Sequence, residues 1–329
     1  MSETLLEARN LTKLYSSGSI FRRRVVKAVD DVSFSISKDK ATITTLAGES
    51  GSGKSTIAKI LLGLIPPTSG QLLYNGMDIF KMNKDEMRAY RKEVQTIFQD
   101  PYAAYNPFYA VEHILSVPIK KFKLAGSRSE EKKIIEDAVQ AVNLSPQIVT
   151  KYPHELSGGE RQRIMIARAL VMQPKLIIAD EPVSMIDASL RAGILNSILE
   201  LKDKHGVSFI YITHDLSTAY YLSDNILVLY RGSVVEAGDV ETVIKNPKHP
   251  YLKQLITAIP IPDPEDRWKN RVALKTEEIT YRVGETCCKY RGRCPEISEG
   301  SCEDKVPPLV LAEPNHYVAC HAIKQHENK

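Results

Sequence analysis

The sequence predicts an α/β protein built around a phosphate-binding loop. Segment 48–56 is Gly-Glu-Ser-Gly-Ser-Gly-Lys-Ser-Thr, which fits the pattern G-x-x-x-x-G-K-S. An apolar run of strand length, 41–46, precedes it, and a helical pattern, 57–64, follows it until Pro66. Strand, glycine loop and helix in this order are what phosphate binding requires. The length of 329 residues suggests about two domains.

The loop residues have distinct expected roles. The glycines allow backbone N–H groups to turn toward an anion, and the helix that follows points its positive end at the same place. Lys54 can reach the β- and γ-phosphates, and the Ser55 hydroxyl can hold Mg²⁺. The alternative is a glycine- and serine-rich turn that binds nothing. The candidate nucleotide-binding residues are Gly48, Glu49, Ser50, Gly51, Ser52, Gly53, Lys54, Ser55 and Thr56.

Composition narrows the functional classes. Hydrophobic residues make up 43% of the chain and charged residues 26%, as in soluble globular proteins. The net charge of +4 does not favour a nucleic-acid partner. No apolar run approaches the roughly 18 residues of a membrane span, and segment 1–7 lacks the features of a secretory signal. We therefore expect a cytoplasmic protein whose membrane role, if any, comes through a partner.

Polar side chains follow two further apolar strands. Run 175–179 ends in Asp180 and Glu181, and run 207–213 ends at His214. Strand ends at one edge of a parallel sheet line a ligand crevice. Asp180 can hold Mg²⁺, Glu181 can act as general base, and His214 can contact the γ-phosphate. The alternatives are a solvated acidic pair and a structural histidine.

Other segments have weaker signals. Alternating runs 5–11 and 25–36 predict strands, 71–76 a hairpin, and about 102–165 a helical block that includes a helix near 130–142. Ser157 is a good N-cap, and Gly158 and Gly159 leave backbone amides open to an anion; a capped helix with a flexible entry is the alternative. Tyr15 can stack on adenine or be an edge tyrosine. The basic loop 16–24 can contact lipid phosphate or a partner, or be solvated.

Taken together, these motifs resemble the nucleotide-binding subunit of ABC transporters over about residues 5–245. The matching positions are Lys54 (Walker A), Gln99 (Q-loop), Ser157-Gly158-Gly159-Glu160 (signature), Asp180 and Glu181 (Walker B and catalytic glutamate), Asp187 (D-loop) and His214 (switch histidine). Ser184-Met185-Ile186-Asp187 departs from the usual Ser-Ala-Leu-Asp. The resemblance implies a P-loop NTPase (RecA-like) core with an N-terminal antiparallel β-subdomain and an inserted α-helical subdomain.

A narrower resemblance is to the oligopeptide/dipeptide importers, especially the second of their two ATPase subunits. It rests on segments 98–102, 106–107, 249–251 and 258–264. Ala104-Tyr105 departs from the Ser-Leu usual there, which affects the surface that couples to the membrane subunits. The implied domains are an ABC nucleotide-binding domain over 1–245, with its helical subdomain at about 102–165, and a cysteine-rich C-terminal extension over 246–329.

The resemblance implies ATP-driven peptide import, with oligosaccharide import as the alternative. Each ATP is held between Walker A of one subunit and the signature of another. Lys54, Glu181 and His214 are the implied catalytic residues, and Ser55, Gln99 and Asp180 the magnesium ligands. The implied partners are a paralogous ATPase forming a heterodimer, two transmembrane permeases and an extracytoplasmic solute-binding protein, with this chain at the cytoplasmic face of the membrane. A soluble ABC ATPase outside transport and a non-catalytic regulatory cassette are alternatives of other classes. The soluble ATPase is disfavoured because the sequence has one Walker A motif and no sustained heptads. The non-catalytic cassette is disfavoured because Lys54, Glu181 and His214 are intact.

All five cysteines lie in the last 43 residues, which in a cytosolic chain favours metal over disulfides. The tail past Lys245 is proline-rich and suggests a linker and an appendage. Its cysteines resemble those of the peptide importers, which implies a [4Fe–4S] cluster. Four thiolates suit such a cluster, but also Zn²⁺. The expected ligands are Cys288, Cys294, Cys302 and Cys320, with Cys287 able to replace Cys288 and with His316 and His321 as weaker candidates.

Overall fold

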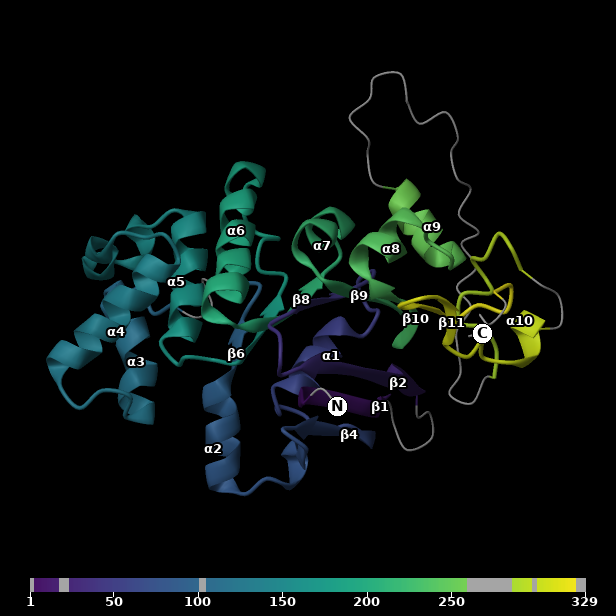
Figure 1. Cartoon of the computed structure of the whole chain (residues 1–329), viewed down its shortest axis with the longest axis horizontal. Helices are drawn as coiled ribbons and strands as arrows, with labels where there is room; N and C mark the ends of the chain where they lie inside the picture. The colour runs from purple at the N-terminus through teal and green to yellow at the C-terminus, as the bar shows by residue number, and fades with distance from the viewer. Residues whose placement is uncertain (1–2, 18–23, 101–104, 259–285, 298–300, 324–329) are drawn as a thin grey trace, which may run out of the picture.

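The computed structural model describes residues 3–17, 24–100, 105–258, 286–297 and 301–323, to which every structural statement below applies. Two β-sheets lie on either side of helix α1 (Lys54–Leu61), and a block of helices flanks them at one end (Figure 1). The α/β fold class predicted from the sequence is confirmed.

The larger sheet has the strand order β11-β12-β10-β9-β3-β8-β7-β6. Its centre is parallel, as short strands joined by helices require, and β10, β12 and β11 complete it in antiparallel pairing. Every residue of β3 and β8 is buried, as expected when helices or a second sheet cover both faces. The strands are β3 (Ile43–Ala47), β6 (Val94–Ile97), β7 (Leu176–Asp180), β8 (Ser208–Thr213), β9 (Asn225–Tyr230), β10 (Ser233–Asp239), β11 (Val310–Glu313) and β12 (His316–Val318).

The smaller sheet is antiparallel, with the order β2-β1-β4-β5. It consists of β1 (Thr4–Ser17), β2 (Arg24–Ser37), β4 (Ser69–Tyr74) and β5 (Met77–Asp78). Both long strands extend beyond the predicted runs 5–11 and 25–36. Alternate residues of β7 and β8 face opposite cores: Ile178 and Ile210 pack with α1 and the smaller sheet, whereas Ile177 and Phe209 pack with the helical block.

The helical block contains α3 (Val111–Phe122), α4 (Arg128–Ala141) and α5 (Gly158–Leu170), with short 3₁₀ turns at Pro146–Thr150 and Pro153–Glu155. It occupies the left of Figure 1, beside α6 (Ala188–His205). Helix α4 confirms the helix predicted near 130–142, and the Ser127 hydroxyl caps it by accepting the Glu130 N–H. The sequence reading missed α2 (Lys84–Glu93), whose N-terminus has a capping box between Asn83 and Glu86.

The C-terminal segment differs from the prediction of a linker and an appendage. After α7 (Leu216–Leu222), α8 (Val240–Lys245) and α9 (Pro250–Thr257), the described tail includes α10 (Ser301–Asp304), β11 and β12. Strand β12 pairs with β10, so the tail joins the central sheet. Buried His316 Nε2 lies 2.6 Å from buried Glu236 Oε1, which fixes the tail to the sheet. The periodic pattern of hydrophobic residues in a sequence does not predict a buried polar pair of this kind.

Several sequence-based interpretations fall outside the described residues. They concern Arg22 and Arg23 of the basic loop, Pro101-Tyr102 and Ala104, and the proline-rich segment 259–264. Among the helices that the structure describes, none is both long and apolar enough to cross a membrane.

Candidate nucleotide site

The loop between β3 and α1 has a backbone that only glycine can supply at two positions. Gly48 has φ +147° and Gly53 has φ +104°, both in the region that L side chains rarely adopt. A Cβ on Gly48 would lie 2.3 Å from the Leu229 carbonyl oxygen, and one on Gly53 would lie 2.3 Å from that of Ala28. The loop therefore packs tightly against β9 and β2.

Lys54 is the first residue of α1, and its buried side chain turns back onto the loop. Its Nζ donates to the carbonyl oxygens of Gly48 (2.6 Å) and Glu49 (2.9 Å). Burial lowers the pKa of Lys54, while Glu181, Asp180 and Glu49 act in the opposite direction. A desolvated ammonium surrounded by loop oxygens is well suited to an anionic ligand such as a phosphate.

Three side chains from neighbouring strand ends meet at the edge of the sheet beside the loop. Glu181 Oε1 lies 2.9 Å from His214 Nδ1, and Gln99 Nε2 donates to Glu181 Oε2 at 3.2 Å. These residues follow β7, β8 and β6, which are adjacent in the sheet. Glu181 has φ +46°, an uncommon conformation for a non-glycine residue, and its N–H donates to the Ile212 carbonyl at 2.9 Å. The backbone thus holds this carboxylate within hydrogen-bond distance of His214 and Gln99.

Asp180, at the end of β7, is the second acid of the site. Burial raises its pKa, Glu181 raises it further, and Lys54 and Lys59 act against this. A cation beside the pair would relieve the cost of two adjacent carboxylates. The described residues contain no group of three or more His, Cys, Asp or Glu side chains arranged to hold a metal ion. Mg²⁺ takes one or two carboxylates from a protein and completes its shell with phosphates and water, so the chemistry of Asp180 suits this ion.

The residues expected to form the signature lie in the helical block, not beside the loop. The Ser157 hydroxyl accepts the Glu160 N–H at 3.2 Å, and Glu160 Oε2 accepts the Ser157 N–H at 2.8 Å, which gives a capping box at the start of α5. A Cβ on Gly159 would lie 3.3 Å from Leu190 Cδ1 of α6, so the signature packs against the first turn of that helix. The N-cap of α6 is Asp187, which is exposed. Figure 1 shows α5 in the helical block at the left and α1 at the centre.

Comparison with known proteins identifies the family. The ABC transporter family model matches residues 29–184, and the model for the C-terminal region of oligopeptide/dipeptide transporters matches 235–302. The putative oligopeptide transport ATP-binding protein YkfD of Bacillus subtilis is 39% identical over 326 residues, covering 99% of this chain and 97% of that protein. AppF of the same organism, an oligopeptide transport ATP-binding protein, is 38% identical over 324 residues, with 97% of each chain covered. This chain belongs to the ATP-binding subunits of the oligopeptide/dipeptide ABC transporter family.

Solved structures agree with this assignment. The ATP-binding cassette MJ0796, in a dimeric post-hydrolysis state bound to ADP and Pi, has a TM-score of 0.62 at 26% identity, covering 71% of this chain and 98% of that one. CbiO1 of Clostridium perfringens has a TM-score of 0.65 at 24% identity, covering 78% and 96%, and supports the fold alone. The match to the ABC transporter family model over residues 29–184 includes both Lys54 and Asp180, whose roles stay predictions.

Tyr15, expected to stack on adenine, lies on β1 opposite Val26 of β2. It is 41% exposed, and Lys13 Nζ lies 5.7 Å from its ring centroid. The ring is therefore accessible on the antiparallel sheet, and its role stays a prediction.

Two residues that contact the Walker A loop were missed in the sequence. The Tyr251 hydroxyl accepts the Glu49 N–H at 3.0 Å, and the Arg293 guanidinium forms two bonds to the Glu49 carboxylate at 3.0 and 3.1 Å. Both come from the C-terminal extension. Tyr251 lies in a segment that already resembled the importer branch, but no motif or spacing in the sequence linked either residue to the loop.

All five cysteines belong to residues 286–297 and 301–323, the C-terminal cysteine module, which is coloured yellow in Figure 1. No disulfide joins the five cysteines, all of which belong to the described residues. The Cys288 N–H donates to the Cys302 carbonyl at 2.9 Å. Burial raises the pKa of Cys288 to about 11, and the nearby thiols of Cys302, Cys294 and Cys320 add to this. The four predicted ligands are thus neighbours, although within the described chain they do not form a group set to hold a single metal ion.

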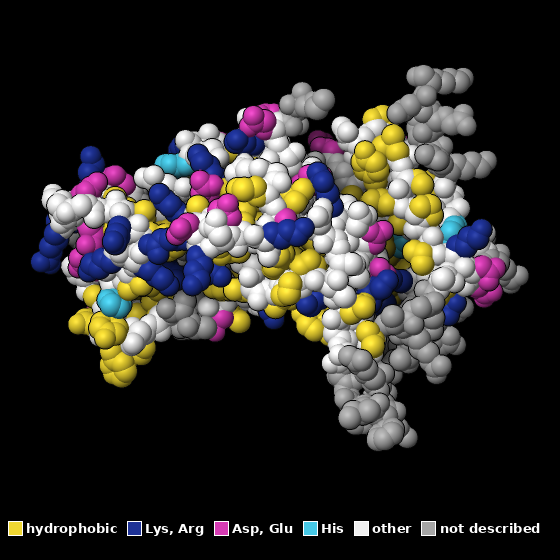
Figure 2. All heavy atoms as spheres, turned by 90° about the horizontal axis from the view of Figure 1, so that it is seen from below, with side chains coloured by type: hydrophobic (Ala, Val, Ile, Leu, Met, Phe, Trp, Pro, Cys, Tyr) yellow, Lys and Arg dark blue, Asp and Glu magenta, His cyan; other side chains and the backbone are white. Residues whose placement is uncertain are grey.

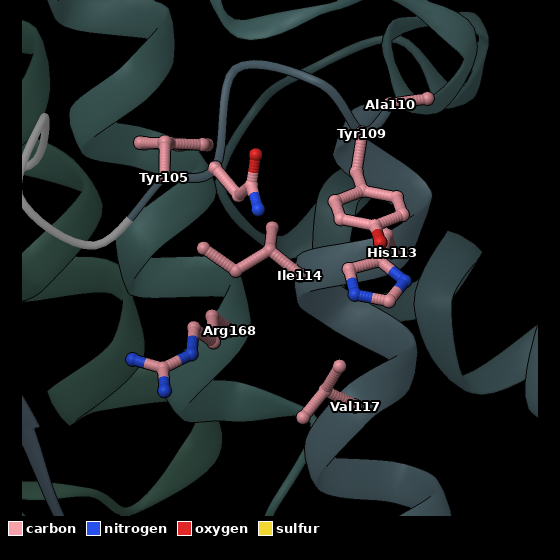
Figure 3. A pocket seen from close by; sticks show the side chains of 8 residues that line it. Tyr105, Tyr109, Ala110, His113, Ile114, Val117 and Arg168 are labelled. Atoms are coloured by element: carbon pink, nitrogen blue, oxygen red, sulfur yellow. The ribbon is translucent and has the colours of Figure 1, made fainter.

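A pocket of about 210 Å³ lies next to the Q-loop segment, between α3 and α5 (Figure 3). Tyr109 stacks on His113 with ring centroids 4.2 Å apart. Arg168 of α5 lines the other side of the pocket, with its guanidinium directed away from this pair (Figure 3). Tyr105, which stands where the importer branch usually has Leu, donates its hydroxyl to the Arg161 carbonyl at 2.9 Å. The departure from the usual residue therefore ties this surface to the signature helix.

Proposed function

We propose that this chain binds MgATP and hydrolyses it to power the import of oligopeptides or dipeptides through an ABC transporter. The observation that carries the hydrolytic part is the meeting of Glu181, His214 and Gln99 beside Lys54. The peptide substrate is supported by relatives named for oligopeptide transport, which match nearly the whole chain.

Each residue has a distinct role in this proposal. Lys54 and the loop amides hold the β- and γ-phosphates. Ser55, Gln99 and Asp180 would hold Mg²⁺, which neutralises charge on the phosphates. Glu181 accepts the proton of the attacking water, and His214, 2.9 Å away, orients that carboxylate and contacts the γ-phosphate.

The experiment that tests this role is Glu181→Gln, which keeps size and hydrogen bonding but removes the base. We expect retained ATP binding and hydrolysis slower by on the order of 10²-fold. The exposed Glu112→Gln on α3 is the matched control and should hydrolyse ATP like the wild type. Hydrolysis by Glu181→Gln at a rate close to the wild-type rate would refute the assignment.

We further propose that Ser157, Gly158, Gly159 and Glu160 complete the ATP site of a second ATPase subunit. Their position at the start of α5, away from α1 of the same chain, supports this (Figure 1). The proposed complex has a paralogous ATPase, two permeases and an extracytoplasmic binding protein, with this chain on the cytoplasmic face of the membrane. Native mass spectrometry of the purified complex tests it, and two copies of this chain without another ATPase would contradict the heterodimer.

The pocket of Figure 3 is the proposed contact with a permease. Phe108 is 84% exposed and Tyr109 50% exposed beside it. Hydrophobic side chains also protrude at the end of the molecule formed by the helical block in Figure 2. Exposed aromatic side chains are typical of protein contacts, and this surface adjoins the Q-loop, through which closure would move the membrane subunits.

The four clustered cysteines are proposed to hold a [4Fe–4S] cluster, with Zn²⁺ as the alternative. Their proximity, in a segment with little apolar core of its own, supports a metal-stabilised module. Such a cluster needs thiolates, whereas burial raises the pKa values of Cys288, Cys294 and Cys320, so the metal must displace their protons. Anaerobic purification with iron, sulfide and zinc analysis tests this, and stoichiometric zinc without iron would contradict the cluster.

A further inference from the structure

The cysteine module reaches the phosphate-binding loop through one ion pair. Arg293 Nη1 lies 3.0 Å from Glu49 Oε2, and Arg293 Nη2 lies 3.1 Å from Glu49 Oε1. Two parallel N–H···O bonds of this kind fix both the distance and the orientation of the carboxylate. Arg293 is the neighbour of Cys294, one of the four clustered cysteines.

Other contacts hold the module in place, so the pair is not an isolated surface contact. Lys289 Nζ lies 2.6 Å from Asp30 Oδ2 and donates to the Arg231 carbonyl at 3.0 Å. The buried Tyr290 ring packs against Tyr230 and Tyr251, with ring centroids 5.2 and 5.6 Å away. Arg293 is thus presented by a packed surface, with its side chain 27% exposed and that of Glu49 41% exposed.

Glu49 is held at each of its polar groups. Its N–H donates to the Tyr251 hydroxyl at 3.0 Å, and its carbonyl accepts Lys54 Nζ at 2.9 Å and the Ser52 N–H at 3.1 Å. Its carboxylate goes to Arg293. The position of Glu49 therefore influences the position of Lys54, and its negative charge acts on the Lys54 ammonium, which is expected to bind the phosphates.

The charge of Glu49 is unfavourable for the proposed ligand. It is the only acidic residue in the loop 48–56, and a nucleotide triphosphate brings several further negative charges to that loop. Like charges this close repel one another strongly where solvent is partly excluded. A guanidinium bound to both oxygens cancels this repulsion and cannot lose its proton near neutral pH.

We propose that Arg293 is a positioning residue of the nucleotide site: it neutralises Glu49 and holds the phosphate-binding loop ready for the triphosphate. The C-terminal cysteine module is then a working part of the ATP site, separated from the loop by 244 positions in the chain. This inference rests on the proposed ATP-binding function.

The test measures the affinity of the full-length protein for Mg²⁺ and a slowly hydrolysed ATP analogue, by calorimetry. Arg293→Ala should weaken binding about fivefold to tenfold, as expected for one unpaired carboxylate near the phosphates in a half-exposed setting. Arg293→Lys should be intermediate, because a lysine keeps the charge but not the paired geometry. Lys305→Ala is the matched control: it removes an exposed positive charge from the same module and should bind like the wild type.

The double variant Arg293→Ala/Glu49→Gln separates charge compensation from loss of structure. Removing the carboxylate should restore affinity to within about twofold of the wild type, which a merely unfolded module would not allow. If Arg293→Ala fails to fold, Glu49→Gln alone decides: binding equal to or tighter than that of the wild type supports the inference, and binding weakened fivefold overturns it.

Two further results overturn the inference in distinguishable ways. If Arg293→Ala binds the nucleotide like the wild type, or if Glu49→Gln fails to rescue it, the inference is wrong and the proposed function stands. If the wild type binds no nucleotide, the proposed function itself fails, and the inference fails with it.

Discussion

His249 makes the stability of the C-terminal extension depend on pH. Its ring is buried, its Nδ1 accepts the Tyr251 N–H at 3.0 Å, and its own backbone N–H donates to Glu236 at 2.8 Å. Burial, and to a smaller extent the charge of Lys253, lower the pKa of His249 to about 4 from an ordinary value of 6.5. The side chain must be neutral to serve as the N-cap acceptor of α9.

The sign of the effect follows from proton linkage. Between pH 4 and pH 6.5 the His249 ring is protonated in the unfolded state but neutral in the folded state. The free energy of unfolding therefore falls as the pH falls through this window. Each pH unit is worth about 1.4 kcal/mol inside the window. Between pH 7 and pH 5 the loss from this group alone is about 2 kcal/mol, and it approaches about 3 kcal/mol below pH 4.

The perturbation is His249→Asn, which removes the titrating ring and retains a strong N-cap residue. Thermal unfolding at pH 7, 6 and 5 should show a wild-type Tm that falls by about 3 °C more than that of the variant, because a chain of 329 residues has a large entropy of unfolding. His205→Asn, at an exposed position of α6, should keep the wild-type pH dependence. An identical fall in Tm for wild type and His249→Asn would refute this account.

Three other variants test the packing of the site and its supports. Glu236→Ala leaves the buried His316 without its partner and should lower the free energy of unfolding by about 3–5 kcal/mol, measured by urea titration; a loss below about 1 kcal/mol would contradict the role of this pair. Gly53→Ala places a Cβ 2.3 Å from the Ala28 carbonyl oxygen and should abolish nucleotide binding in calorimetry. Tight binding by this variant would contradict the prediction and show that the loop can shift. Asn83→Ala removes the N-cap of α2 and should cost about 1 kcal/mol in the same urea assay with unchanged ATP hydrolysis; altered hydrolysis would place α2 in the catalytic cycle.

The sequence was sufficient to predict that the loop and the residues at the strand ends lie together, because the signals for them are local. The glycine loop, its strand and its helix are contiguous, and the acids and His214 stand directly at the ends of buried strands. Since the carboxyl ends of parallel strands share one edge, their convergence could be expected without coordinates. What could not be expected is the exact pairing of Gln99 with Glu181, because it depends on β6 being the neighbour of β7.

The tail escaped prediction for a different reason. Strands β11 and β12 are four and three residues long, too short for an alternating pattern to be distinct from chance. Buried Glu236 fixes β12, and Arg293 fixes another part of the tail, through partners that lie 80 and 244 positions away. Local sequence propensities do not predict contacts between residues so far apart in the chain. Helix α2, by contrast, was missed despite a visible signal, since Asn83-x-x-Glu86 is a capping-box pattern.

The pairing of β12 with β10 has a consequence for synthesis on the ribosome. Strand β10 pairs with β9 on one side, and until β12 arrives its other side is an open edge with unpaired backbone groups at Glu236, Ala237 and Gly238. The strand that covers this edge is made only after most of the intervening tail, a delay on the order of ten seconds at ordinary translation rates. During that interval the nascent chain offers a template for pairing with another chain. A chaperone that shields this edge would then raise the yield of folded protein.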